Sequence, residues 1–274
     1  FFLLIFSSSI HSGYLDYLNL NNKQIYNSSY NSFGQIGLIQ TPVADSRPEG
    51  SIAITLNKND MWKFGSLTAS PFNWLEASYF YYRPSDLRWG PNNVRGFFLD
   101  KGFNVKFIYR SKRKSLPNIA IGLDDFAGTG YFTREYIVAT KQFNKTKFTV
   151  GMGWGKFTGK NSFKNPLSEL SPSFLIRPVI SDNIKLGGSP SYDQWFRGDA
   201  TIFGGIEHSL SFARGLNLKL EYDPLDYLNF SANNRGDAIY AVRKKDSDVN
   251  IGLSYALNKN ITIDASYIKG NTFN

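Results

Sequence analysis

The chain of 274 residues contains no cysteine and only two histidines, His11 and His208. The absence of cysteine excludes disulfides, thiol catalysis and cysteine-ligated metals. Two histidines are also too few for a histidine-based zinc site, and His11 lies in the segment at 1–13 that we expect to be a signal-peptide remnant. His208 has no nucleophile-elbow motif to complete a Ser-His-Asp triad. We therefore expect no enzymatic activity, no cofactor and no metal.

Carboxylate pairs are the remaining catalytic option. Asp124 with Asp125, or Asp223 with Asp226, could supply the two acids of a glycoside hydrolase. Adjacent aspartates in turns more commonly accept hydrogen bonds from the local backbone. We interpret these four residues as loop-capping carboxylates at strand ends.

Long apolar runs are also missing, since no segment reaches the roughly 18 apolar residues of a membrane-spanning helix. The block FFLLIF at 1–6 and the small residues that follow it are typical of the end of a secretory signal. The alternative for this block is a buried first strand. We expect residues 1–13 to be a signal-peptide remnant and residues 14–33, which lack periodicity, to be an N-terminal linker.

The charge balance is positive, with 31 Lys and Arg against 22 Asp and Glu and a formal net charge of +9. The basic run at 110–114 is interpreted as a solvated turn, although it could also attract acidic polysaccharide or lipid headgroups. The sequence has no helical basic stripe and no nucleic-acid-binding motif. We expect no nucleic-acid partner.

What the chain has is strict alternation of apolar and polar residues. Val249, Ile251, Leu253 and Tyr255 alternate with small polar residues, and residues 261–267 repeat the pattern. Successive side chains of a strand point to opposite faces, so each segment separates two environments. A soluble sandwich would place the apolar face inside, whereas a membrane barrel would place it outside.

Alternation of this kind predicts about eleven long strands. They are expected at 52–56, 62–65, 75–81, 103–109, 119–124, 132–143, 148–155, 200–210, 216–222, 248–257 and 261–267. Residues 238–243 are a candidate twelfth strand, and residues 34–42 are predicted to form a short strand.

The connections between these strands alternate in length from the third strand onward. Turns at 144–146, 211–214 and 258–260 are tight, whereas those at 83–101, 157–199 and 223–247 are long. Outer-membrane barrels keep short turns at one rim and long loops at the other. A soluble sandwich has no reason to segregate its loops in this way.

Charged residues fall on the polar face in the middle of the strands, and burying so many without partners in a sandwich core would be prohibitive. We therefore expect these side chains to line a solvated lumen: Glu76, Lys106, Asp124, Lys219, Glu221 and Asp264. Aromatic residues near strand ends suit interfacial belts: Trp62, Trp74, Tyr109, Trp154 and Tyr222. The predicted fold is all-β, an antiparallel up-and-down transmembrane β-barrel over residues 34–274. We expect the barrel to be truncated at its C-terminus.

A series of motifs also resembles the YjbH-type (GfcD-like) family of exopolysaccharide and group 4 capsule proteins. These motifs are GLIQTP at 37–42, IGLDDFAGTG at 121–130, EYIVATK at 135–141, TVGMGWG at 149–155, FGGIE at 203–207, LEYD at 220–223 and NIGLSY at 250–255. The resemblance implies an outer-membrane β-barrel encoded with polysaccharide-secretion genes, and it implies no catalytic residues. The chain is much shorter than is usual in that family.

We interpret the chain as a non-enzymatic protein of the bacterial outer membrane that assists export or surface assembly of exopolysaccharide or capsule. Its surroundings would be outer-membrane lipid, and its partners polysaccharide and other polysaccharide-secretion proteins. Candidate lumen or sugar-contacting residues are Glu76, Lys106, Lys219 and Glu221 inside, with Trp89 and Trp195 on long loops. Two alternatives stay open. One is a general diffusion porin with a wide lumen, and the other is a secreted carbohydrate-binding or carbohydrate-active β-sandwich that is soluble without detergent.

Overall fold

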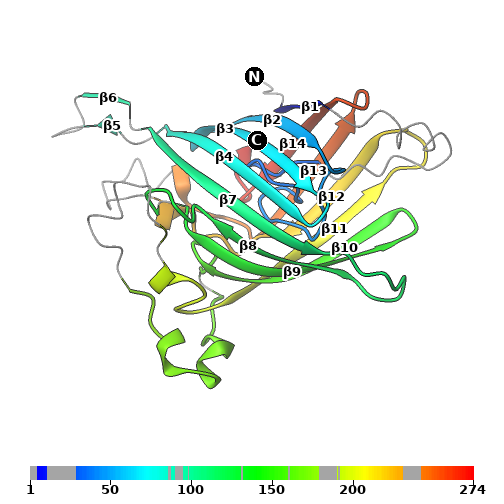
Figure 1. Cartoon of the computed structure of the whole chain (residues 1–274). Coiled ribbons are helices and arrows are strands. Elements are labelled where there is room, and N and C mark those ends of the chain that lie inside the picture. The colour runs from blue at the N-terminus through cyan, green and yellow to red at the C-terminus, as the bar shows by residue number, and fades with distance from the viewer. Residues whose placement is uncertain are drawn as a thin grey trace.

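The computed structural model describes residues 5–10, 29–85, 88–89, 95–97, 99–130, 132–159, 161–178, 190, 192–230 and 242–274. In these residues the chain forms one 13-stranded antiparallel sheet whose strands follow one another in chain order (Figure 1). The strands are β1 (Ile5–Ile10), β2 (Ser51–Lys58), β3 (Trp62–Phe72), β4 (Leu75–Pro84), β7 (Asp100–Tyr109), β8 (Asn118–Asp124), β9 (Arg134–Phe143), β10 (Thr146–Gly155), β11 (Thr201–Ser209), β12 (Leu216–Tyr222), β13 (Val249–Ala256), β14 (Ile261–Ile268) and β15 (Thr272–Phe273).

The eleven long strands from β2 to β14 match those expected from alternation, which confirms an all-β, up-and-down antiparallel fold. The predicted short strand at 34–42 is wrong, because this segment has only isolated bridges, Tyr30 with Ile36 and Gly37 with Pro42. Most of the candidate twelfth strand at 238–243 lies outside the described residues. Its last two residues, Val242 and Arg243, are not in a strand.

The N-terminal strand β1 occupies part of the segment expected to be a signal-peptide remnant. It pairs antiparallel with β2 through residues 7–10 and with β14 through residues 5–8. These two partners begin and end the run of long strands. In the described residues β1 therefore lies beside both β2 and β14, in agreement with the alternative interpretation of this block as a first strand.

Alternate connections lie at the same edge of the sheet because the strands run up and down in order. One edge carries the turns 144–145, 210–215 and 257–260, and the other carries the long connections after β4, β10 and β12. The long connections contain the small hairpin β5 (Arg88–Trp89) and β6 (Arg95–Phe97), and the 3₁₀ helices η3 (Pro166–Glu169), η4 (Pro172–Phe174), η6 (Tyr192–Gln194) and η7 (Tyr227–Phe230). The predicted segregation of loop lengths is confirmed. We call these the short-turn edge and the long-loop edge.

The direction of the alternation is clear from burial. In β2, buried and exposed residues alternate without a break, and the exposed ones include Ile52, Ile54 and Leu56. The same holds along β13, where Ile251 and Leu253 are exposed. The apolar face of the sheet is thus turned outward and the polar face inward. The sheet curves around its polar face (Figure 1).

The aromatic belt predicted from strand ends is only partly correct. Trp74 and Tyr109 are on the outer face, 48% and 66% exposed, and Tyr222 is partly exposed. Trp62 and Trp154 are instead buried in the interior. Trp62 lies on the inward face of β3, where it packs against Tyr82 and Tyr227 at ring-centroid distances of 5.9 Å each. Aromatic rings fill this part of the interior as readily as they would line lipid.

A cluster of aromatic side chains fills the interior around Phe33. The Phe33 ring lies 5.7 Å from both Phe64 and Phe132, and 5.8 Å from Trp62. Two inward glycines bring the sheet wall close to the enclosed chain. A Cβ on Gly205 would meet the Leu220 carbonyl oxygen of the sheet as well as Leu38, the latter at 2.8 Å, and one on Gly252 would meet Ile39 at 3.1 Å. A larger residue at Gly252 would press on Ile39 of the enclosed chain, and one at Gly205 would also clash with the backbone of β12.

Candidate functional site

The concave side of the sheet encloses residues 29–45, which we call the inner segment. Its bends are made locally: the Asn31 side chain accepts hydrogen bonds from the backbone N–H groups of Phe33 and Gln35, and Gly34 has a φ of 74°. Residues 29–44 are all buried. A buried irregular segment leaves backbone groups without sheet partners, so side chains of the wall must supply them.

Glu221 of β12 is the main acceptor for these groups. Its carboxylate accepts hydrogen bonds from the backbone N–H groups of Ile39 (3.1 Å), Gln40 (2.9 Å) and Thr41 (2.8 Å). The Thr41 hydroxyl adds a fourth at 2.7 Å, and the Asn250 amide of β13 donates at 2.9 Å to the other oxygen. Several donors converging on one carboxylate offset part of the cost of burying its charge at this fully buried position.

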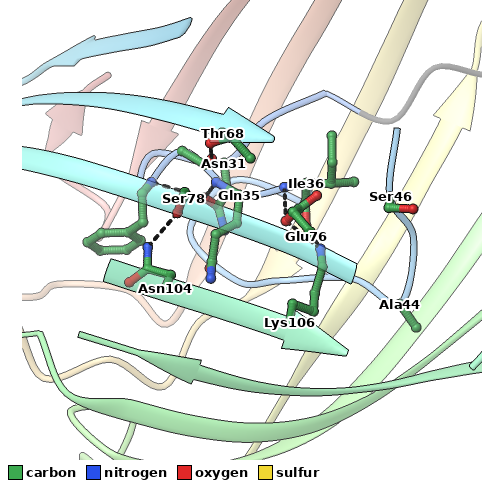
Figure 2. A network of polar contacts seen from close by, with 12 residues as sticks. Asn31, Gln35, Ile36, Ala44, Ser46, Thr68, Glu76, Ser78, Asn104 and Lys106 are labelled. Atoms are coloured by element: carbon green, nitrogen blue, oxygen red, sulfur yellow. Dashed lines mark hydrogen bonds and ion pairs between the residues drawn. The ribbon is translucent and has the colours of Figure 1, made fainter. Parts of the chain in front are cut away.

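Glu76 of β4 and Lys106 of β7 clamp Ile36 from the opposite wall (Figure 2). The two residues are cross-strand partners and form a buried ion pair at 2.9 Å. Glu76 accepts the Ile36 N–H at 3.2 Å, and Lys106 donates to the Ile36 carbonyl at 3.1 Å. The pair thus satisfies both backbone groups of one residue of the inner segment.

Lys219 of β12 holds the segment from the same side as Glu221. Its ammonium donates to the Leu38 carbonyl at 2.7 Å and to the Gly37 carbonyl at 3.3 Å, and it also contacts the Ser29 hydroxyl. Asp264 of β14 lies 3.8 Å from this ammonium. Lys219 and Glu221, two residues apart on one strand, therefore bind the carbonyls and the N–H groups of the same short stretch.

A second buried ion pair supports the beginning of the segment. Arg134 of β9 binds Asp124 of β8 at 2.6 Å, and the Gln35 amide donates to the same carboxylate at 2.5 Å. The Arg134 guanidinium also lies 4.0 Å from the centroid of the Phe33 ring, in cation–π geometry. Asp124 is thus a structural partner of the inner segment rather than a free acid.

The end of the inner segment is fixed near the short-turn edge. Asp45 forms an ion pair with Lys147 of β10 at 3.0 Å and accepts from Asn118 at 3.2 Å, while Thr140 accepts the Ala44 N–H at 2.9 Å. Burial opposes ionisation of Asp45, but the Lys147 charge and the two hydrogen bonds outweigh it and lower the pKa of Asp45 to about 2.

The structure places the four predicted interior residues on the inward face, as expected. The expectation that they are solvated is wrong, because Glu76, Lys106, Lys219 and Glu221 are each at most 2% exposed and bind the inner segment. Asp264 is also buried. Alternation thus predicted the face of the sheet on which these residues lie, but not the inner segment that they bind. A contact of these residues with sugar stays a prediction.

The two predicted loop tryptophans lie apart from this network. Trp89 belongs to β5 in the connection after β4. Trp195 follows η6, is partly buried and packs against Tyr192 with ring centroids 4.8 Å apart. The Trp195 contact agrees with loop packing, and neither position tests a role in sugar binding.

Residues that sequence reasoning missed include Thr41, Gln35 and Asn250. The sequence held one indication of this network. Glu76 and Lys106 have opposite charges, were predicted on the same face, and come from strands that pair directly. Charges arranged in this way imply pairing rather than solvation. The inner segment itself has no periodicity, so its burial left no such signal.

The second candidate catalytic pair, Asp223 and Asp226, accepts local hydrogen bonds. Asp223 accepts from the Leu225 N–H at 2.9 Å and from the Tyr227 hydroxyl at 2.5 Å, and Asp226 accepts from the Leu228 N–H at 3.0 Å. These are the local bonds expected of loop-capping carboxylates. In the described part of the chain, no three His, Asp or Glu side chains gather as metal ligands.

These features define an all-β protein built on one antiparallel sheet. The apolar face of the sheet is outward, and its charged inner face is bonded to an enclosed N-terminal segment. No helix in the described residues is long and apolar enough to cross a membrane. The model of the YjbH family, described as "Exopolysaccharide biosynthesis protein YbjH", matches residues 29–274, and the chain belongs to this family. This confirms the resemblance noted from the motifs, including the inner-segment motif at 37–42.

A curated relative extends this result. The chain is 33% identical over 251 residues to the "Uncharacterized lipoprotein YjbH" of Escherichia coli (strain K12). The match covers 89% of this chain but 34% of the relative, so the chain spans about a third of the length of that protein. No solved structure matches the chain.

Proposed function

We propose that the sheet is the wall of an outer-membrane β-barrel, closed through β1, and that the protein assists export or surface assembly of exopolysaccharide without enzymatic chemistry. The observation that carries this proposal is the outward apolar face. Consecutive outward positions of β13, Val249, Ile251, Leu253 and Tyr255, are 43–52% exposed. Soluble monomers rarely expose contiguous apolar patches of more than a few hundred Å². The exposed apolar face therefore supports placement of the sheet in lipid.

The family supports the link to exopolysaccharide. Its model is described by exopolysaccharide biosynthesis, and the relative from Escherichia coli is named a lipoprotein, a name that suits a membrane-associated protein. The segregation of short turns and long loops to opposite edges is typical of outer-membrane barrels. We place the long loops at the cell surface, where they would meet the polymer.

The filled interior separates this proposal from a general diffusion porin. A porin keeps a polar, water-filled channel, whereas the inward charges here bind the inner segment. Passage of a polymer through the interior of the barrel would require the inner segment to move. The proposal therefore favours assembly at the surface, or export coupled to a partner that displaces the segment.

A secreted β-sandwich is the second candidate, and it predicts the opposite surroundings for the outer face. It would leave the apolar positions of β2 and β13 in water and dissolve without detergent. Cell fractionation separates the two at once. Recovery in the outer-membrane fraction and extraction only with detergent support the barrel.

A deletion strain tests the role in secretion. Loss of the gene should reduce surface and released exopolysaccharide while cytoplasmic precursors continue to be made. A His208→Ala variant should restore export to the deletion strain, because the imidazole bonds only to the Thr146 hydroxyl (2.8 Å) in the described residues and is assigned no chemistry. Normal export in the deletion strain would refute the secretion role. Failure of a folded His208→Ala variant would favour an enzyme.

A further inference from the structure

The outer face carries a row of three cations at the long-loop edge. Lys58 ends β2 and pairs across the strands with Lys63 of β3, which in turn pairs with Arg83 of β4. Both lysines are exposed and Arg83 is partly exposed, in phase with the outward apolar residues of their strands. Lys101 of β7 is also exposed, and it pairs with Tyr81, the outward residue that precedes Arg83 on β4. We call Lys58, Lys63 and Arg83 the cationic row.

The cationic row differs from the inner face in the signs of the charges that face each other across neighbouring strands. Inside, charges that face each other across strands have opposite signs, as in Glu76 with Lys106 and Asp124 with Arg134. Like charges directly opposite each other on neighbouring strands are destabilising. Within the described residues neither Lys58 nor Lys63 forms an ion pair with a carboxylate. An external anion would relieve the repulsion between the two lysines.

An apolar groove of about 450 Å³ lies against this row. It is lined by outward residues of the same strands, Leu56, Gly65 and Tyr81, and by Leu99 of the following connection, together with the three cations. Gly65 forms part of the depression because it has no side chain. A Cβ built there would meet only Leu56, at 3.5 Å, and a Thr55 carbonyl at 4.0 Å. The groove can therefore be filled by substitution without disturbing the backbone.

We propose that the cationic row and this groove bind a phosphorylated lipid of the surrounding leaflet, with phosphate on the cations and an acyl chain in the groove. The inference rests on the membrane placement proposed above. Lysine and arginine are the usual partners of phosphate. Three neighbouring strands span about 10 Å across the row. That width suits a headgroup with more than one phosphate, such as a diphosphorylated glycolipid.

The apolar groove argues for a lipid over a free polyanion. An acidic polysaccharide or inorganic phosphate could contact the cationic row, but neither has an apolar part to occupy the space beside Leu56 and Tyr81. A lipid satisfies both features at once, and it would approach from the side on which the apolar face lies. The two kinds of anion can be told apart by filling the groove.

The test uses the full-length protein purified in a neutral detergent, with lipid binding followed by native mass spectrometry. The probes are diphosphoryl lipid A, its monophosphoryl form and sodium pyrophosphate. Lys58→Gln/Lys63→Gln should weaken binding of diphosphoryl lipid A about tenfold, because two charge-assisted contacts are lost. The control Lys112→Gln/Lys114→Gln removes the same charge from the exposed turn after β7, at the short-turn edge, and should change nothing.

Gly65→Leu separates the two parts of the site. Filling the groove should weaken lipid A binding while leaving pyrophosphate binding unchanged, and monophosphoryl lipid A should bind less tightly than the diphosphoryl form. Pyrophosphate binding equal to that of lipid A, unaffected by Gly65→Leu, would instead show a site for free polyanions and overturn the lipid assignment.

Failure of the lipid site and failure of the membrane placement give different results. Protein that remains in the outer membrane but binds lipid A equally in the wild type, in Lys58→Gln/Lys63→Gln and in the control overturns the lipid site alone. Protein that dissolves without detergent and binds no lipid A overturns both. Recovery in the membrane with the expected loss only in the row and groove variants supports both.

Discussion

Neighbouring residues of β12 meet opposite surroundings. Leu218 and Leu220 are 40% and 45% exposed on the outer face, whereas Lys219 and Glu221 are 2% and 0% exposed on the inner face. In a soluble protein the leucines would be inside. The two faces of the sheet are therefore stabilised by different means. Bonds to the inner segment stabilise the inner face, whereas the outer face is in contact with the surrounding medium.

The inner face depends on specific partners. Glu76, Lys106, Lys219 and Glu221 are satisfied there by atoms of the inner segment or by a charge on a neighbouring strand. A buried charge that loses its partner is costly. Under the proposed membrane placement, the outer face depends on an apolar environment and not on particular partners. Substitutions on the two faces should consequently differ in size and in their dependence on solvent.

The largest effect is expected at Glu221. Glu221→Ala leaves the N–H groups of Ile39, Gln40 and Thr41 buried without their acceptor. We expect a loss of about 4 kcal/mol in the free energy of unfolding, given about 1–3 kcal/mol for each unsatisfied group and partial relaxation. Urea unfolding in detergent measures it. The control Glu169→Gln removes a largely exposed ion pair with Lys164 and should cost less than about 1 kcal/mol. Equal losses would show that the inner segment is not held as described.

A charge on the outer face should be next in size and should depend on depth. Leu253→Arg near the middle of β13 should cost about 2–4 kcal/mol if lipid surrounds it, and Leu257→Arg, just past the strand end, about 0–1 kcal/mol. Unfolding from lipid vesicles measures both. Two equally mild effects would place this face in water.

A smaller effect is expected from pH, through Asp45. Its pKa of about 2 in the folded protein lies below the value of 3.8 for an ordinary aspartate. A lowered pKa in the folded state contributes stability that is present above pH 4 and is lost as the pH falls toward 2. The loss should be about 2 kcal/mol. Stability measured from pH 5 to pH 2 should show this loss in the wild type and a shallower slope in Asp45→Asn. Identical slopes would contradict the ion pair with Lys147.

The long-loop edge and the short-turn edge should differ in their accessibility from outside the cell. A cysteine at the exposed Asn161, in the connection after β10, should react with a membrane-impermeant thiol reagent on intact cells. A cysteine at Lys145, in the turn after β9, should react only after the cells are opened. The native chain has no cysteine, so the signal has no background. The reverse pattern would invert the orientation.

The sequence predicted the strands because alternation is a local property. Residues 249–255 carry it clearly, and β13 appears there. Turn lengths likewise predicted which connections share an edge. What alternation cannot predict is the content of the interior, since an enclosed chain without periodicity, such as residues 29–45, looks the same as a linker.

The same limit explains the residues that were misplaced. Trp62 and Trp154 were predicted at a lipid interface because aromatic rings are common there, but rings also fill an interior, and composition does not distinguish the two. Glu76 and Lys106 were predicted in water because burying charges without partners would be prohibitive, but they form an ion pair with each other. Their shared backbone partner, Ile36, is forty residues or more away from each in sequence. A substitution such as Ser254→Arg, which a solvated interior would tolerate, now falls on a buried position.

The central claim is that one face of the sheet meets lipid while the other meets a filled interior. Spin labels placed one at a time from residue 249 to residue 256, in the full-length protein in lipid vesicles, test it most directly. Collisions with oxygen, which concentrates in lipid, should peak at 249, 251, 253 and 255, and collisions with a water-soluble nickel chelate should stay low at 250, 252 and 254. Nickel collisions that peak at the even positions would show a water-filled lumen. Nickel collisions that peak at the odd positions would show a soluble protein with its apolar face in water.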